Sequence, residues 1–335
     1  MMSRSGDDAT VEGPFAGSRT DRTATVAADD GAPLAVEEIE PLDGHRAAVT
    51  VVGVHGFALS RRSWYLQRRD LAGTLLPGAR HVYYDHRGHG QSASADAQRS
   101  TIEQLAVDLH AVLRTAAPDT PVVLWGHSMG GMVIMELAQS YPDLFAERIQ
   151  GVALIATAAG EIGAHGLPRS LLSKYNPLMR GVGELAEWQP GLVEFVRAAG
   201  GQLTRAAVRR LAFGARDVDS HLVDFMLDML GEAPVRQLSH FVDTLGSHNR
   251  YAALAGLKHT DVVVIGGDAD RLTPFAHAER IAAELPRARL VRVEGAGHMV
   301  HMEEAEVVNR HLADLVRRCG GDGAGKTRRN TWWRS

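Results

Sequence analysis

The chain has 335 residues, of which 45% are hydrophobic, so it can form one large domain or two small ones with a sizeable buried core. Its formal net charge of -4 is small for this length and gives no electrostatic case for nucleic acid as the main partner. The single cysteine, Cys319, excludes an internal disulfide, and it lacks the surroundings of an activated thiol. The N-terminal residues do not resemble a signal peptide, and no stretch approaches the roughly 18 apolar residues of a membrane helix. We therefore expect a cytoplasmic protein without an integral membrane segment.

Composition divides the chain into a core with attached segments. Residues 1–21 mix Ser, Gly and Asp without an apolar run, which predicts a disordered N-terminal segment. Residues 319–335 are Gly-rich and basic and predict a flexible tail. Strand and helix patterns alternate over residues 22–156 and 257–318, which predict the core. Residues 157–256 hold helix-like runs broken by Gly and Pro, among them 183–200, and predict an inserted helical cap.

The first elements of the core follow in order along the chain. Two β-like runs separated by Asp-Asp-Gly-Ala-Pro predict a hairpin at about residues 23–40. The β-branched run at 48–55 predicts a strand buried on both faces. A helical stretch at 63–72 and a strand at 80–85 come next. Apolar residues at helical spacing over 100–116, with Ser100 or Thr101 as the cap, predict an amphipathic helix.

The alternation continues through residues 122–138, which read as a strand, a sharp turn and a helix. Such alternation predicts a mostly parallel sheet with helices on both faces and ligands bound beyond the carboxyl ends of the strands. The remaining elements are expected as strands at 149–156, 261–266 and 288–294 and as helices at 274–285 and 300–316.

The turn at Gly126-His127-Ser128-Met129-Gly130 is the strongest candidate for a nucleophile. Glycines two residues to either side of Ser128 permit a tight turn that pushes the hydroxyl out over the sheet edge. The alternative is a glycine turn that packs the helix and carries an incidental serine. A serine hydroxyl needs a general base and an orienting acid, so its partners decide between the two.

The partners are found after two later strands. Asp268 and Asp270 follow the strand at 261–266, and His298 follows the strand at 288–294. The order Ser, Asp, His along the chain is the order expected for an α/β-hydrolase.

Five motifs in this order resemble the α/β-hydrolase fold superfamily over roughly residues 23–318: VHGF, YDHRGHGQS, GHSMGG, GGDADRLTP and GAGHMVHMEE. The resemblance implies an α/β fold with a mostly parallel, doubly wound sheet and an inserted helical cap. It also implies that Ser128 is the nucleophile, that His298 is the general base and that Asp270 orients it. The family pattern Gly-x-x-Asp favours Asp270 over Asp268.

By the same resemblance, the backbone N–H groups of Phe57 and Met129 would form the oxyanion hole. The leading hypothesis is hydrolysis of a small carboxylic ester through an acyl-enzyme, with no metal and no organic cofactor. A perhydrolase that resembles cofactor-free haloperoxidases, or another hydrolase with the same triad, is the alternative. A non-catalytic ligand-binding protein would be expected to have a broken triad.

The cap is expected to supply an apolar acyl pocket. Apolar residues surround much of the helix-like run at 222–230, including Phe225 and Met226, and Phe241 follows. The alternative is that these three side chains merely pack the cap onto the core.

Several histidines have structural interpretations. Asp85, His86 and His89 could suggest a metal site, but they lie in one Gly-rich loop, which the resemblance to α/β-hydrolases implies is a structural turn. We expect His55 to hold its loop by hydrogen bonding, His127 to be packed beside the nucleophile and His301 to lie on the surface of the closing helix.

Overall fold

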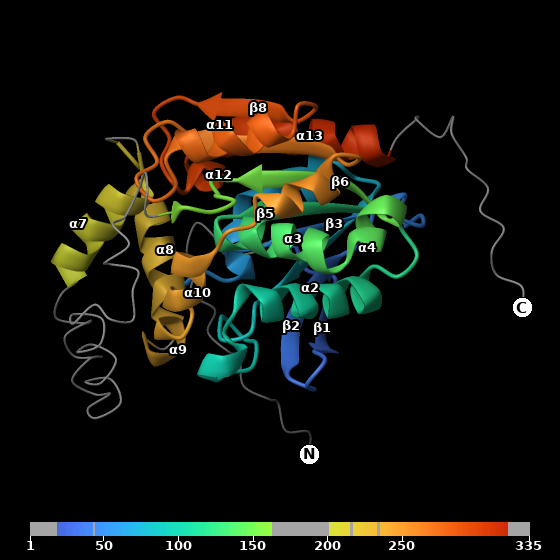
Figure 1. The fold of residues 1–335 in the computed structure, drawn as a ribbon, viewed down its shortest axis with the longest axis horizontal. Coiled ribbons are helices and arrows are strands. Elements are labelled where there is room, and N and C mark those ends of the chain that lie inside the picture. Colours follow the sequence, from blue (N-terminus) through green and yellow to red (C-terminus); the bar gives the residue numbers. More distant parts are fainter. Residues whose placement is uncertain (1–18, 43, 163–200, 215–216, 233–234, 321–335) are drawn as a thin grey trace, which may run out of the picture.

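The computed structural model of the chain describes residues 19–42, 44–162, 201–214, 217–232 and 235–320 (Figure 1). The predicted helical run at 183–200 lies outside these residues, as do most of the predicted N-terminal segment and most of the basic tail.

An eight-stranded sheet in the order β1-β2-β4-β3-β5-β6-β7-β8 forms the centre of the molecule. The predicted hairpin forms its antiparallel part, since β2 pairs antiparallel with both β1 and β4. All other pairs are parallel, as the alternation of strand and helix patterns predicts. The strands are β1 (Arg22–Ala27), β2 (Pro33–Ile39), β3 (Val49–Val54), β4 (Ala79–Tyr84), β5 (Val122–His127), β6 (Ile149–Ile155), β7 (Asp261–Gly267) and β8 (Arg289–Val293).

Helices cover both faces of this sheet and extend beyond one of its ends. Thr101 begins α2 as its N-cap, because its side chain accepts a hydrogen bond from the N–H of Gln104 (3.1 Å). The α-helices are α1 (Tyr65–Gln67), α2 (Ile102–Ala116), α3 (Met129–Ser140), α4 (Pro142–Glu147), α7 (Gly201–Ala212), α8 (Ser220–Glu232), α9 (Val235–Ser239), α10 (Val242–Ser247), α11 (Phe275–Glu284), α12 (Val300–Glu303) and α13 (Ala305–Gly320). Shorter or irregular turns are η1 (Arg61–Trp64), η2 (Arg68–Leu75, π-helical), η3 (Ala97–Arg99) and η5 (Ala252–Leu257).

The central strands are buried on both faces because successive side chains enter different cores. Leu124 of β5 packs into the core formed with α2, α3 and α11, whereas its neighbours Val123 and Trp125 pack into the core formed with α13 and η2. All six residues of β3 and of β5 are buried. Figure 1 shows α2 and α3 side by side on the first of these faces. This double burial fixes the ends of β3 and β5, where the candidate site lies.

Four described helices, α7 to α10, are inserted between β6 and β7 and form the cap. They lie beyond the carboxyl ends of the strands, on the left in Figure 1. A small core joins the two parts: Phe213, Val223 and Met229 of the cap pack with Leu59 and Met299 of the sheet domain. The cap therefore covers the end of the sheet at which α/β proteins bind ligands.

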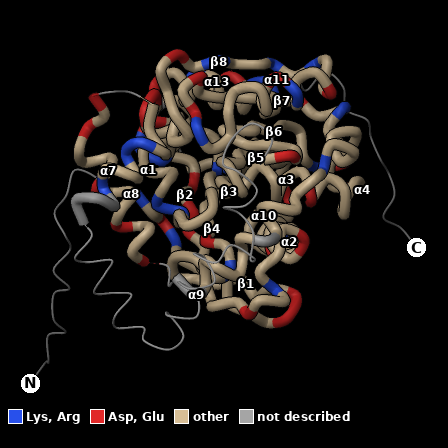
Figure 2. Tube along the Cα trace, turned by 60° about the vertical axis from the view of Figure 1, so that its left-hand side comes forward, with Lys and Arg blue, Asp and Glu red and all other residues tan. Residues whose placement is uncertain are grey.

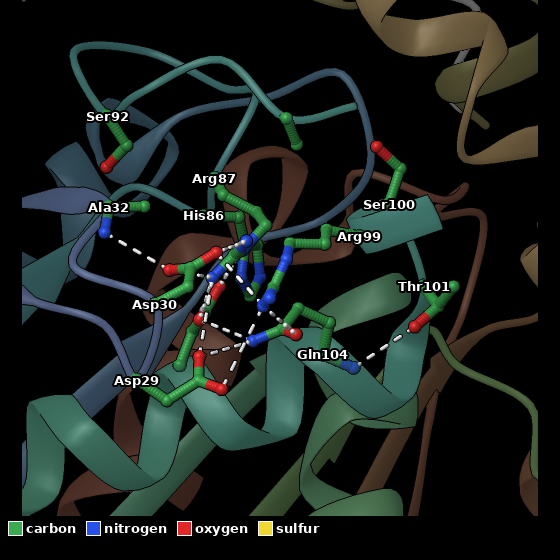
Figure 3. A network of polar contacts seen from close by, with 12 residues as sticks. Asp29, Asp30, Ala32, His86, Arg87, Ser92, Arg99, Ser100, Thr101 and Gln104 are labelled. Atoms are coloured by element: carbon green, nitrogen blue, oxygen red, sulfur yellow. Dashed lines mark hydrogen bonds and ion pairs between the residues drawn. The ribbon is translucent and has the colours of Figure 1, made fainter. Parts of the chain in front are cut away.

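A buried ion-pair network holds the loop that follows β4 (Figure 3). Arg87 donates to both carboxylate oxygens of Asp108 in α2, at 2.6 Å each. It also donates to Asp30, in the turn of the hairpin, at 3.0 and 3.3 Å. Burial raises the pKa of the Asp108 carboxyl, against the opposing effect of Arg87. This loop is thus a structural turn that ties the hairpin to α2.

Three expectations for the helices differ from the structure. The stretch predicted as one helix at 63–72 is divided among η1, α1 and η2. The predicted closing helix is divided at Glu304, and its second part, α13, continues through Cys319 to Gly320. His301, predicted on the helix surface, is fully buried, 5.1 Å from the ring of Trp64. The break after α12 is the reason, because this four-residue helix packs against η1 rather than continuing the face of α13.

The described residues show how charged side chains are distributed and whether any helix could cross a membrane. Acidic and basic residues are scattered among each other along the described trace (Figure 2). No described helix is long and apolar enough to cross a membrane.

Candidate active site

Ser128 occupies a strained turn between β5 and α3. Its backbone has φ 52° and ψ -117°, a region that costs an L-residue about 1–3 kcal/mol. The turn is tight because glycine stands on both sides: a Cβ at Gly126 would lie 2.6 Å from Ile134 Cδ1, and one at Gly130 would collide with the carbonyl of Val54. The backbone N–H of Ser128 donates to Ile155 O (2.9 Å). The hydrogen bond to β6 and the neighbouring glycines thus hold Ser128 at the carboxyl end of β5.

His298 connects Ser128 to Asp270 by two hydrogen bonds. His298 Nε2 lies 2.9 Å from Ser128 Oγ, and His298 Nδ1 lies 2.9 Å from Asp270 Oδ2. Asp270 cannot donate, so Nδ1 carries the imidazole proton and Nε2 is free to accept the proton of the serine hydroxyl. The hydroxyl, the imidazole and the carboxylate are thus linked in series by hydrogen bonds, the arrangement of a nucleophile, a base and an orienting acid.

Asp270 is held in place by its own loop. Its Oδ1 accepts hydrogen bonds from the N–H groups of Leu272 (2.8 Å) and Thr273 (2.9 Å), and its Oδ2 accepts one from the Thr273 hydroxyl (2.8 Å). Burial alone would raise the pKa of this carboxyl, but His298 and these donors outweigh burial and lower it. Asp268 instead lies away from His298, and its Oδ1 accepts from the Gly295 N–H at 2.8 Å.

Two segments that carry the backbone N–H groups predicted for an oxyanion hole lie next to Ser128. Met129 is the first residue of α3, so its N–H has no acceptor within the helix. Phe57 lies in the turn after β3, next to Gly56, at which a Cβ would lie 3.2 Å from Ser128 Cβ. Ala58 completes this turn with a positive φ of 59°. The turn after β3 therefore lies directly against the serine.

His55 fixes the turn after β3 to the loop after β4. Its Nε2 accepts a hydrogen bond from the N–H of His86 (3.0 Å), so its Nδ1 carries the proton and donates to Gly56 O (2.8 Å). Burial lowers the pKa of His55 to about 4, and the ring is neutral at pH 7. His55 therefore acts on the geometry of its loop, as the sequence predicts, and has no described contact with Ser128.

His127, the last residue of β5, contacts the loop that carries His298. Its Nε2 donates to the backbone oxygen of His298 (2.9 Å), and its ring centroid lies 4.2 Å from that of His301. Burial, with His301 and His298 nearby, lowers the pKa of His127 well below its usual value. A neutral, packed His127 is the arrangement that the sequence predicts.

A cavity of about 340 Å³ opens above Ser128. Of the three side chains predicted to line it, Met226 does so. Phe225 and Phe241 are not among the described residues of its wall: Phe225 packs against Tyr65 (6.2 Å between ring centroids) and Phe241 against His89 (5.1 Å). The described wall contains no Asp, Glu, Lys or Arg, and its apolar side chains come mainly from the turn after β3, α7 and α8. These include Leu59, Val208, Leu211, Met226, Leu230 and Met299.

Sequence reasoning assigned no role to three side chains of the site. Thr273 bridges Asp270 and His298, and its position three residues after Asp270 is the signal that could have revealed it. Thr157 donates to the backbone oxygen of Ser128 at 2.7 Å, and Glu303 accepts from the N–H of Gly297 at 2.8 Å. The Thr157 contact has no local sequence signal, because it joins segments 29 residues apart, whereas Glu303 and Gly297 lie within the one motif GAGHMVHMEE.

The described residues contain no group of three or more His, Cys, Asp or Glu side chains that could hold a metal ion. Burial raises the pKa of Cys319 to about 12, which disfavours the thiolate, and Gly151 of β6 packs beside this sulfur.

The chain belongs to the α/β-hydrolase fold family, whose model matches residues 49–305. It is 28% identical over 280 residues to the dihydrolipoyllysine-residue acetyltransferase component of the acetoin cleaving system of Pseudomonas putida, covering 82% of this chain and 65% of that protein. It is 25% identical over 301 residues to a putative 2-succinyl-6-hydroxy-2,4-cyclohexadiene-1-carboxylate synthase of Bacillus subtilis, covering 88% and 98%. Among solved structures, a putative aryl esterase from Burkholderia cenocepacia has a TM-score of 0.67 at 25% identity, covering 89% and 99%.

Proposed function

We propose that this protein is a serine hydrolase that cleaves small carboxylic esters with apolar acyl groups. The observation that carries the proposal is the chain of hydrogen bonds from Ser128 through His298 to Asp270 at the base of an apolar cavity. The likeness to a putative aryl esterase and to a putative carbamate hydrolase also favours hydrolysis of an acyl derivative.

The proposed reaction proceeds through an acyl-enzyme. Ser128 Oγ attacks the ester carbonyl while His298 Nε2 takes the hydroxyl proton, and Asp270 stabilises the imidazolium that forms. The N–H groups of Phe57 and Met129 stabilise the negative charge on the carbonyl oxygen, each worth on the order of 3 kcal/mol. His298 then gives its proton to the leaving alcohol. A water molecule deprotonated by His298 releases the acid and restores Ser128.

The apolar cavity wall sets the expected substrate class. A wall without described charged side chains gives a charged acyl group no partner, whereas an alkyl or aryl group buries its surface there at about 25 cal/mol per Å². We therefore propose an uncharged acyl group, and we assign acyl selectivity to α7 and α8.

A panel of p-nitrophenyl esters of increasing acyl length, with wild type and Ser128→Ala, tests this function. We expect the wild type to hydrolyse the panel and to be labelled by a fluorophosphonate at Ser128, and the variant to do neither. Hydrolysis at near wild-type rate by folded Ser128→Ala would refute the mechanism. Hydrogen-peroxide-dependent peracid formation that greatly exceeds hydrolysis would favour the perhydrolase alternative.

A further inference from the structure

The end of helix α7 is in backbone contact with the loop that carries His298. The N–H of Met299 donates to Ala212 O at 2.9 Å. A Cβ at Gly214 would collide with the backbone of Gly295, and a Cβ at Gly297 would collide with the backbone of Gly214. Glycine on both sides permits this approach. We call this junction between residues 210–214 and 295–299 the seam.

One carboxylate bridges the two sides of the seam. Glu303, the last residue of α12, accepts from the N–H of Gly297 through Oε1 (2.8 Å) and from the N–H of Gly214 through Oε2 (2.8 Å). Hydrogen bonds to an ionised group are stronger than neutral ones. Glu303 therefore links Gly297, the residue before His298, to Gly214 of the cap and fixes the distance between them.

A second charged side chain reaches the same helix end from the other catalytic loop. Arg271, adjacent to Asp270, donates from Nη1 to the backbone oxygens of Arg210 (2.7 Å) and Phe213 (3.1 Å). These carbonyls belong to the last turn of α7 and the residue beyond it, where partners within the helix are missing. The loops of the acid and of the base are thus both bonded to the end of α7.

The same helix also forms part of the cavity wall, through Ala207, Val208, Leu211 and Ala212. An acyl group that packs against α7 restricts the motion of its last turn, and the seam passes this restriction to His298. We propose that Glu303 is a positioning residue that couples occupancy of the apolar cavity to the placement of the general base. This inference rests on the proposed ester hydrolysis and adds a kinetic consequence: part of the benefit of a longer acyl group appears in kcat and not in KM.

The test compares Glu303→Gln with the wild type on the ester panel, with rates expressed per site labelled by a fluorophosphonate. The amide has one oxygen for two N–H donors, so one side of the seam is released. A displacement of about 1 Å at a base can lower a rate by about 100-fold. In Glu303→Gln, we expect kcat at the preferred acyl length to fall by roughly 10-fold to 100-fold. As a result, kcat should no longer rise with acyl length. The fall of KM with length should remain.

Glu304→Gln is the matched control, because its exposed neighbouring carboxylate takes no part in the seam. It should keep the wild-type profile. If Glu303→Gln does not fold, Arg271→Ala carries the same test from an exposed position. A kcat profile equal to that of the wild type, or lowered by one factor at every acyl length, would overturn the coupling and leave the esterase function intact. Absence of labelling and hydrolysis in the wild type would instead overturn the proposed function.

Discussion

The hydroxyl oxygen of Thr273 lies 2.8 Å from Asp270 Oδ2 and 3.2 Å from His298 Nδ1, so it contacts both members of the acid–base pair. The hydroxyl donates to the carboxylate and leaves a lone pair facing the imidazole N–H. Thr273→Val removes this donor without changing the volume much, and we expect a loss of roughly 10-fold in kcat, on the scale of one hydrogen bond to a charged group. Thr273→Ser, which keeps the hydroxyl, should restore most of the activity in the same steady-state assay.

Replacement of the orienting acid should distinguish the two aspartates after β7. Asp270→Asn leaves His298 without a carboxylate to fix its tautomer, and we expect kcat to fall by about 10⁴-fold. Asp268→Asn should have a mild effect, because Asp268 contacts the N–H of Gly295 and not the imidazole. Steady-state rates on one activated ester suffice, and the opposite ranking of the two variants would reassign the acid.

The strained backbone of Ser128 predicts that two inactive variants differ in stability. Ser128→Ala keeps a Cβ at φ 52°, whereas Ser128→Gly relieves the strain. Both variants should be inactive, and the glycine variant should be more stable than the alanine variant by about 1 kcal/mol. Urea denaturation of the two proteins measures this difference. Equal midpoints would mean that the turn stores no strain.

Acyl selectivity should depend on Met226 but not on its neighbour. Met226→Ala removes part of the cavity wall and should change relative kcat/KM between short and medium esters by up to roughly 10-fold to 200-fold. Phe225→Ala should lower the free energy of unfolding by about 3–5 kcal/mol and leave the acyl profile unchanged, because Phe225 packs against Tyr65. A change of profile in Phe225→Ala alone would place the pocket elsewhere in the cap.

Buried neutral histidines should make the fold sensitive to acid. Burial, with Arg68 nearby, lowers the pKa of His81 from 6.5 to about 3. In the unfolded chain this group titrates near 6.5, so the unfolded state binds more protons between pH 6.5 and about 3. The free energy of unfolding should therefore fall as the pH falls through this window, by up to about 1.4 kcal/mol per pH unit for this group.

His81→Phe should make this dependence shallower by up to one proton in urea melts at several pH values. His221→Gln, at an exposed position of the cap, is the control and should keep the wild-type slope. An unchanged slope in His81→Phe would show that this imidazole does not contribute to acid sensitivity.

Several residues of the candidate site can be predicted from the sequence because their signals lie within short stretches of the chain. Ser128 stands between glycines that only a tight turn requires, and His298 follows a strand pattern after the short turn Gly295-Ala296-Gly297. The position of Met226 in the cavity and of Phe225 outside it is not encoded locally. The two are adjacent on one helix, and which face meets the cavity depends on how the cap packs on the sheet domain. His301 was placed wrongly because a four-residue helix has too little periodicity to define a face.

Strand β8, at one edge of the sheet, could affect how molecules associate at high concentration. As an edge strand it has backbone groups available for pairing with a strand of another molecule. Its Arg289 and Arg292 are exposed, and Arg292 lies over the ring of Phe275 (4.1 Å) and pairs with Glu279 (3.0 Å). A second chain that added a strand here would have to desolvate these charges. The arginines of β8 therefore disfavour the addition of a further strand at this edge of the sheet.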